Sequence, residues 1–247
     1  MSTLNVDEIR SQSFIGAPVD VNGIPVTYSA TTDVIGIGEN ALQNCSGPDN
    51  VAVGKNTLVA LTTGDDNTAL GVGALQLTTG TNNTGLGRNA GSTSTTGTNN
   101  IFIGTGSSGS SVTASDEITL GNSSHTVIRA AVTTITSLSD ARDKKDIKDL
   151  STGLEFVEAL RPVEFVWNDR DESGKHDVAD FGFIAQDLKK AQEDVDKADV
   201  LKLVYEENLE KLEASYGKLV PILVKAIQEM SSEIKSLKEE ILTLKTK

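Results

Sequence analysis

The feature that most constrains this chain is a short sequence repeat in its first half. The unit begins with asparagine and closes with glycine four residues later, and its closing glycines lie 17, 16 and 17 residues apart. A fixed period over several copies predicts a repeat architecture, in which each unit buries its apolar face only against its neighbours. The copies are Asn50-Val-Ala-Val-Gly54, Asn67-Thr-Ala-Leu-Gly71, Asn83-Thr-Gly-Leu-Gly87 and Asn100-Ile-Phe-Ile-Gly104, with an earlier variant at Val34-Ile-Gly-Ile-Gly38.

Each unit is predicted to form a short β-strand between tight turns. Apolar side chains alternate within it, as at Val51 and Val53 or at Ile101 and Ile103, and glycine, asparagine and Thr-Thr-Gly runs separate the units. This pattern is typical of strands of about two to five residues and not of helices.

The repeat resembles the β-roll heads of trimeric adhesins and the fibrous segments of phage tail fibres. That resemblance implies a mainly β N-terminal half, of β-roll or β-solenoid type, in a trimeric protein. We expect the repeat region to span residues 32–138, with a last strand-like stretch over residues 117–129 that turns at Gly121-Asn122. Residues 1–31 precede it, and residues 4–9 and 18–26 are expected to be short extended segments. This region resembles the virion-attachment end of small phage fibres, with a capping or disordered segment as the alternative.

The chain changes character near residue 138. Residues 1–138 hold 18 of the 22 glycines with 10 acidic and 4 basic residues, whereas residues 139–247 hold 4 glycines, 25 acidic and 18 basic residues. The second composition is of the charged kind that helices carry. We therefore place a domain boundary there.

Charge and hydropathy exclude several classes of function. The net charge of −13 argues against a nucleic-acid partner, because phosphate binding requires a basic surface. No apolar run approaches the about 18 residues of a membrane span, and the start of the chain lacks the pattern of a secretory signal, so synthesis in a host cytoplasm is expected. Cys45 has no partner for a disulfide or a zinc site and is expected to be a packed small residue; no metal or cofactor site is recognised.

Four motifs follow one another in the second half. In order and spacing they resemble the intramolecular chaperone that ends phage endosialidases and other tail spikes. The resemblance implies an α+β chaperone domain over 139–247 that assembles a homotrimer. The motifs are Ser139-Asp-Ala-Arg-Asp-Lys144, Leu160-Arg-Pro-Val-Glu-Phe-Val-Trp167, Phe181-Gly-Phe-Ile-Ala-Gln-Asp187 and the run from Tyr216 to Glu229.

The same resemblance implies cleavage of the Leu138–Ser139 bond by the chain itself after the trimer has folded. In that family a Ser-Asp start and a lysine five residues after the serine form the cleavage dyad. These residues are Ser139 and Lys144 here, with Asp140 and Arg142 in support. A serine hydroxyl becomes a good nucleophile only when a base removes its proton. A lysine serves as that base only in its neutral form, which burial and nearby positive charge favour.

Neighbouring charges act on Lys144 in both directions. Arg142 and Lys145 favour its neutral amine, whereas Asp143 and Asp146 favour the charged form. Asp143 also stands where the family usually has a large apolar residue, which puts cleavage competence, though not the fold, in question. The oxyanion hole is expected from backbone N–H groups, which the sequence does not locate.

The remaining patterns predict the elements of this domain. Thr152 and Glu155 have the spacing of a capping box at the start of a helix. Residues 163–167 alternate as a strand, residues 178–184 are its expected hairpin partner, and residues 185–191 are expected to be helical.

A coiled-coil pattern is present over residues 218–245. Apolar residues alternate spacings of three and four, which is an a/d seam of about three and a half heptads. A helix that packs only on its own domain is the alternative. Isoleucine at a with leucine at d favours two strands, while the family resemblance implies three. The seam consists of Val220, Leu223, Ile227, Met230, Ile234, Leu237, Ile241 and Leu244.

These features predict a phage tail fibre or tail spike protein of the virion. Its N-terminal segment is expected to bind other tail or baseplate proteins, and its repeats a host receptor, expected to be a glycan. The alternatives are an uncleaved trimer that keeps the chaperone as a cap, a chain whose main activity is single-turnover self-proteolysis, and a bacterial trimeric adhesin. No carboxylate pair for glycoside hydrolysis is recognised, so host adhesion is favoured over depolymerisation.

Overall fold

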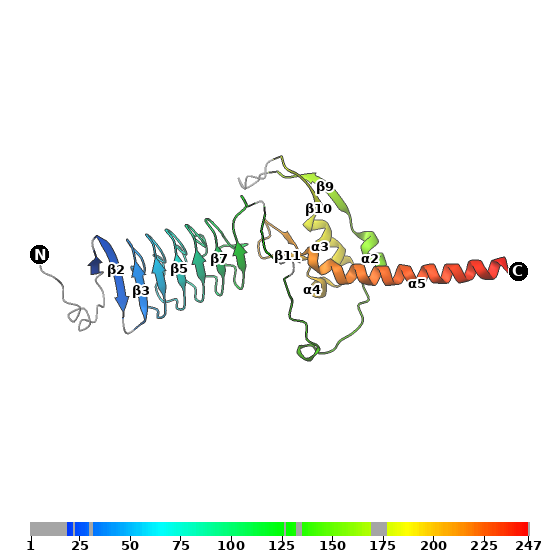
Figure 1. The fold of residues 1–247 in the computed structure, drawn as a ribbon, viewed down its shortest axis with the longest axis horizontal. Helices are drawn as coiled ribbons and strands as arrows, with labels where there is room; N and C mark the ends of the chain where they lie inside the picture. Colours follow the sequence, from blue (N-terminus) through cyan, green and yellow to red (C-terminus); the bar gives the residue numbers. More distant parts are fainter. Residues whose placement is uncertain are drawn as a thin grey trace, which may run out of the picture. The chain divides into compact units, whose positions relative to one another are not determined.

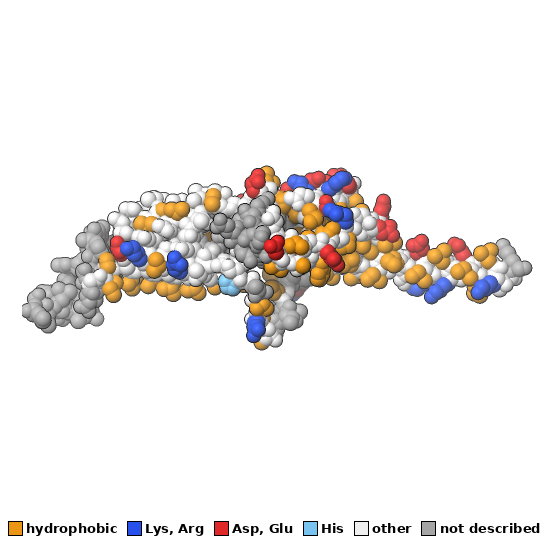
Figure 2. Space-filling model, turned by 90° about the horizontal axis from the view of Figure 1, so that it is seen from above, with side chains coloured by type: hydrophobic (Ala, Val, Ile, Leu, Met, Phe, Trp, Pro, Cys, Tyr) orange, Lys and Arg blue, Asp and Glu red, His pale blue; other side chains and the backbone are white. Residues whose placement is uncertain are grey.

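The computed structural model of the chain (Figure 1) describes residues 19–21, 23–29, 32–125, 127–131, 135–168 and 177–246. The chain divides into two compact units, Met1–Thr126 and Val127–Lys247, whereas the sequence places a boundary at Ser139. Each unit has its own hydrophobic core. In the space-filling view, few charged side chains lie over the repeats, and most lie on the second unit (Figure 2).

The first unit is a β-solenoid-like stack with one strand per repeat. The strands pair in parallel in chain order, and each step of the register equals one repeat, so Ile35 lies opposite Val51 and Val51 opposite Thr68. The repeat architecture and its short strands are thereby confirmed. The strands are β3 (Val34–Ile37), β4 (Val51–Val53), β5 (Thr68–Leu70), β6 (Thr84–Leu86), β7 (Ile101–Ile103) and β8 (Ile118–Leu120).

An antiparallel hairpin covers the first edge of this sheet. Strands β1 (Val19–Val21) and β2 (Ile24–Ser29) pair with each other, and β2 pairs with β3. Because an open edge strand can recruit other chains, the hairpin protects β3 from such pairing. The extended segments expected in this region are confirmed where they are described. Most of the predicted attachment segment, 1–31, lies outside the described residues.

A buried ladder of asparagines runs through the stack. Asn50, Asn67, Asn83 and Asn100 have no exposed surface. The side-chain oxygen of Asn67 accepts hydrogen bonds from the backbone N–H of Asn83 at 3.0 Å and from its Nδ2 at 3.2 Å. Nδ2 of Asn67 donates to the Gly80 carbonyl at 3.0 Å. The same contacts join the other steps, so residues expected only at turns also tie successive repeats together.

The ladder ends at Glu117, which occupies the asparagine position before β8. Its N–H donates to Asn100 Oδ1 at 3.0 Å, and its Oε2 accepts from the Ser110 N–H at 2.9 Å. The substitution of asparagine by glutamate hid this last copy from the repeat pattern. The structure therefore contains one more strand than the Asn-to-Gly pattern counts.

Glycine closes each strand because successive turns approach too closely for a side chain. Gly54 has a φ of 134°, and a Cβ there would lie 2.7 Å from the carbonyl carbon of Gly71. Only glycine combines this backbone conformation with that approach. The core beside these turns consists of small and medium side chains such as Ala52, Ala69 and Leu75, and Cys45 packs against it as predicted.

The second unit contains two small antiparallel sheets and several helices. The predicted hairpin is confirmed as β9 (Pro162–Val166) with β10 (Ala179–Phe183), and its expected turn at Gly174 lies outside the described residues. Strand β11 (Val204–Tyr205) pairs with β12 (Glu213–Ala214). The helices are η1 (Ala141–Asp143), α2 (Leu154–Ala159), α3 (Ala185–Asp194), α4 (Ala198–Leu201), η2 (Tyr216–Lys218) and α5 (Leu219–Lys245).

The core of the second unit joins α2, α3 and the start of α5. Phe156, Leu188, Leu203 and Ile222 are buried at 3% exposure or less. The helix predicted from residue 185 is confirmed as α3 and extends to Asp194. Helix α2 packs against α5, and this contact gives the long helix a fixed base.

We expect Asn67→Ala to destabilise the first unit by roughly 2–4 kcal/mol, because it leaves the Asn83 N–H and the Gly80 carbonyl unpaired in the core. Chemical denaturation followed by circular dichroism measures the change. Asn44→Ala is the matched control, since Asn44 is exposed and donates only to the Val59 carbonyl at the surface, and its effect should stay below about 0.5 kcal/mol. Equal losses in the two variants would contradict the ladder's role.

Candidate functional site

The chain around the predicted cleavage bond is open to solvent. Residues 135–149 are all exposed and contain only the short helix η1. The side chain of Leu138 is 99% exposed and that of Ile135 is 101% exposed. The Leu138–Ser139 peptide bond is therefore accessible, as a scissile bond must be.

Asp140 and Arg142 hold the turn that follows Ser139. Asp140 caps η1, because its Oδ1 accepts a hydrogen bond from the Arg142 backbone N–H at 2.9 Å. The Arg142 guanidinium donates to the same carboxylate, with Nη2 2.6 Å from Oδ2. This guanidinium bond, and then the backbone bond, lower the pKa of Asp140, while the carboxylate raises the pKa of Arg142. The two supporting residues pair with each other and shape the turn.

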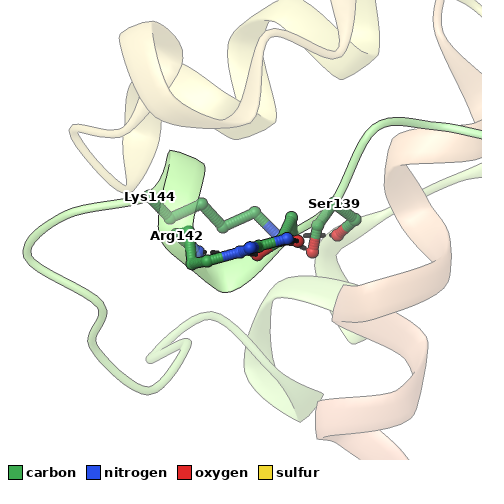
Figure 3. A network of polar contacts seen from close by, with 4 residues as sticks. Ser139, Arg142 and Lys144 are labelled. Atoms are coloured by element: carbon green, nitrogen blue, oxygen red, sulfur yellow. Dashed lines mark hydrogen bonds and ion pairs between the residues drawn. The ribbon is translucent and has the colours of Figure 1, made fainter.

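The turn returns Lys144 to Ser139 (Figure 3). The Lys144 N–H donates to the Ala141 carbonyl at 3.2 Å and closes the turn. Lys144 Nζ then lies 2.6 Å from Ser139 Oγ and 3.2 Å from the Ser139 carbonyl oxygen. A nucleophile and its base need a separation of about 2.6–3.2 Å, so the two predicted catalytic side chains meet the distance requirement.

The described part of a single chain does not bury this pair. Ser139, Lys144 and Asp143 are all exposed. Water favours the charged form of a lysine, and an ammonium group donates to a hydroxyl instead of taking its proton. Asp143 adds a charge, not an apolar cover, to the turn. The arrangement is therefore positioned for proton transfer but lacks the dry surroundings that the reaction needs.

Helix α5 carries two apolar faces that differ in burial. Leu219, Ile222 and Ala226 are buried in the second unit, at 6%, 2% and 3% exposure. The predicted a/d seam from Val220 to Leu244 is instead 44–71% exposed along its whole length. The helix thus packs on its own domain through one face and leaves the seam open. Packing on its own domain is confirmed for the first turns of this helix, and the coiled coil stays a prediction.

Glu229 joins α5 to α2 and corrects one sequence prediction. Helix α2 has Gly153 as its N-cap, and no side chain of the N-cap residue bonds to it, so the predicted capping box of Thr152 and Glu155 is wrong. Glu229 Oε2 accepts the hydrogen bond from the Leu154 N–H at 2.7 Å instead. That bond lowers the pKa of Glu229. A Cβ on Gly153 would overlap this carboxylate, which explains the glycine.

Tyr216 makes a second contact that sequence reasoning missed. Its hydroxyl accepts a hydrogen bond from the Phe183 N–H at 3.1 Å, and the two rings meet edge to face with centroids 5.7 Å apart. A Cβ on Gly182 would lie 2.6 Å from that hydroxyl. These residues belong to two of the motifs that carry the family resemblance. The presence of both motifs in one family is the one sequence signal that could have indicated this contact.

The other chemically notable residues form no site in the described ranges. His125 is exposed, and its Nδ1 accepts a hydrogen bond from the Asn122 N–H at 3.0 Å. His176 lies outside the described residues. Within those residues, no group of three or more His, Cys, Asp or Glu side chains could hold a metal ion. None of the described helices has the length and apolarity needed to cross a membrane.

We expect Glu229→Gln to lower the thermal unfolding midpoint of the second unit at pH 7 by roughly 2–4 °C, because a charged acceptor at the start of α2 is lost. The pKa of Glu229 is lowered in the folded chain, so its stabilisation is present above the ordinary carboxylate pKa of about 4.3 and disappears as the pH falls through the folded value.

The difference between wild type and Glu229→Gln should therefore shrink as the pH drops below about 4. Glu233→Gln, one helical turn further on at an exposed position, is the control and should leave the midpoint unchanged. Scanning calorimetry at neutral and acid pH measures both. A deficit of the same size at both pH values would argue against the carboxylate bond.

Comparison with known families agrees with the geometry of this region. Residues 139–197 match a family model described as chaperone of endosialidase, which carries the name of a peptidase family. The match begins at Ser139 and takes in the Ser139–Lys144 pair, α2, the β9–β10 hairpin and α3. Searches of curated proteins and of solved structures found no match. Residues 139–197 are therefore similar to the endosialidase chaperone domain.

Proposed function

We propose that this chain is a homotrimeric phage tail fibre or tail spike protein of the virion. The family match that begins at Ser139 carries the proposal, because a chaperone of this type assembles the chain to which it is attached. The stacked repeat unit and the open seam of α5 support it. We assign residues 1–31 to attachment to the tail or baseplate, 32–138 to a fibre or head that binds a host receptor, and 139–247 to the chaperone.

The chaperone is proposed to cleave itself off at the Leu138–Ser139 bond. Ser139 Oγ attacks the carbonyl carbon of Leu138 and passes its proton to Lys144 Nζ. The C–N bond then breaks, the Ser139 nitrogen takes a proton, and Leu138 is left as an ester on Oγ. Water hydrolyses the ester to a Leu138 carboxylate and a free Ser139 hydroxyl. A single turnover is sufficient, because the reacting groups are held in one chain.

Assembly supplies the condition that a single chain lacks. Ser139 and Lys144 are in contact but exposed, and burial is what favours a neutral lysine. Neighbouring chains in a trimer cover this turn and so couple cleavage to completed assembly. Neighbouring chains could pack on the exposed apolar side chains of this segment, which are Ile135, Leu138 and Ile147.

A fibre that keeps its chaperone as a cap is the second candidate. Asp143 favours it, because this exposed carboxylate stands in the dyad turn where the family usually has a large apolar residue. In that case the second unit acts only as a trimerisation module, and the rest of the proposal is unchanged.

The intact mass of the purified protein tests cleavage. We expect the wild type to separate into residues 1–138 and 139–247, while Ser139→Ala and Lys144→Ala remain whole, because each variant removes one half of the dyad. Lys148→Ala removes an exposed lysine of the same segment, keeps the dyad and serves as the control that should still be cut. A wild type that stays whole would exclude self-cleavage. Asp143→Leu then identifies the cause if it restores the cut.

Replacement of a seam residue tests assembly. Ile241 belongs to the a/d seam, and Leu242 is its off-seam neighbour; their exposures are 51% and 65%. In a Ser139→Ala background, Ile241→Lys should weaken the trimer at least tenfold in dissociation constant, because it places three charges at one level of the coil. Leu242→Lys should have little effect. Equilibrium sedimentation distinguishes them, and equal behaviour would contradict a coiled coil.

A further inference from the structure

The strands of the repeat unit bury only one of their two faces. The middle residue of the strand is inside, with Ala52, Ala69 and Phe102 at 0–1% exposure. The residues on either side of it form two in-register rows on the opposite face. We call them the outer rows. The first consists of Ile37, Val53, Leu70, Leu86, Ile103 and Leu120, and the second of Ile35, Val51, Thr68, Thr84, Ile101 and Ile118.

The outer rows are mainly apolar, and their residues are exposed or half-buried. Within the first row Leu70, Leu86 and Leu120 are 48%, 44% and 54% exposed. Neither row contains a charged residue, and threonine is the only polar type in them. Figure 2 shows hydrophobic side chains in a line along one edge of the repeat unit. Parallel sheets are almost always covered on both faces, so a bare apolar face of this length indicates a missing layer.

We infer that the outer rows are the surface through which the repeat units of different copies of this chain pack side by side. The inference rests on the proposed trimer and adds to it where the fibre itself is held together. The packing is parallel, with the stacks aligned along a common symmetry axis. The first row lies nearest that axis because it is apolar in every strand.

The regular spacing of the rows favours another copy as the occupant. Successive strands of a sheet lie about 4.8 Å apart, so a second stack at the same height presents an identical side chain at every level. Under cyclic symmetry Leu86 of one chain then meets Leu86 of its neighbours. A glycan, by contrast, requires hydrogen-bonding groups, which the first row does not offer.

The chain also provides a means of bringing copies together. The open seam of α5 is proposed to join identical chains, which raises the local concentration of their repeat units. Cleavage after Leu138 removes α5 with the rest of residues 139–247. The outer rows remain on the first unit, so they are the contact that keeps the released fibre assembled.

Cysteine cross-linking of the full-length chain tests this packing. In a Cys45→Ser, Ser139→Ala background, Leu86→Cys should form covalent dimers on mild oxidation, involving up to about two thirds of the chains of a trimer. Leu77→Cys is the matched control, because Leu77 is 49% exposed but lies in the turns after β5 and outside the rows. We expect at least tenfold less dimer from it. Leu70→Cys, one repeat earlier in the same row, provides an independent second position.

Light scattering on the same samples measures the oligomeric state and so tests the proposed trimer separately from the packing of the outer rows. A trimer in which Leu86→Cys and Leu70→Cys cross-link no better than Leu77→Cys would overturn the inference and leave the proposed assembly intact. A monomer would overturn both. A trimer with strong cross-links at both row positions supports the inference. Circular dichroism of each variant verifies that the repeat unit has folded.

Discussion

The first unit depends on the close stacking of its repeats at the distance set by backbone hydrogen bonds. Adjacent strands lie about 4.8 Å apart, and this distance leaves no room for a side chain where successive turns cross. Gly54 and Gly71 satisfy that limit. The turns also bury backbone groups that no strand partner can reach, and the asparagine ladder pairs them. The core consists mainly of alanine and leucine, and the larger ring of Phe102 fits where Gly91 has no side chain.

Many features of both units are determined by local sequence and could therefore be predicted from it. The period of the Asn-to-Gly unit predicts the stack because each repeat contributes one strand. Ser139 and Lys144 meet because a single turn, capped by Asp140, covers the four residues between them. The a/d spacing likewise identifies α5 and its open seam.

Features that depend on contacts between distant residues could not be predicted from the sequence. The N-terminus of α2 is capped by Glu229, which lies 75 residues after Leu154. A capping box, by contrast, is a pattern within four consecutive residues. The strand-like stretch from Glu117 was predicted, and β8 confirms it, but it was not recognised as a copy of the repeat because Glu117 replaces the asparagine. The Glu117 carboxylate binds Ser110 instead. The burial of the ladder was missed as well, since asparagine beside glycine is equally typical of an exposed turn. In each case a tertiary contact overrides the local preference.

The two ends of the stack are finished differently, by the β1–β2 hairpin on β3 and by Glu117 at β8. Between these ends the parallel register and the asparagine ladder recur from one repeat to the next. A repeat of 16 or 17 residues could therefore be added or removed in the middle of the stack while both end structures keep the same kind of neighbour. Duplication or loss of one repeat within the gene therefore changes the length of the stack in steps of about 4.8 Å.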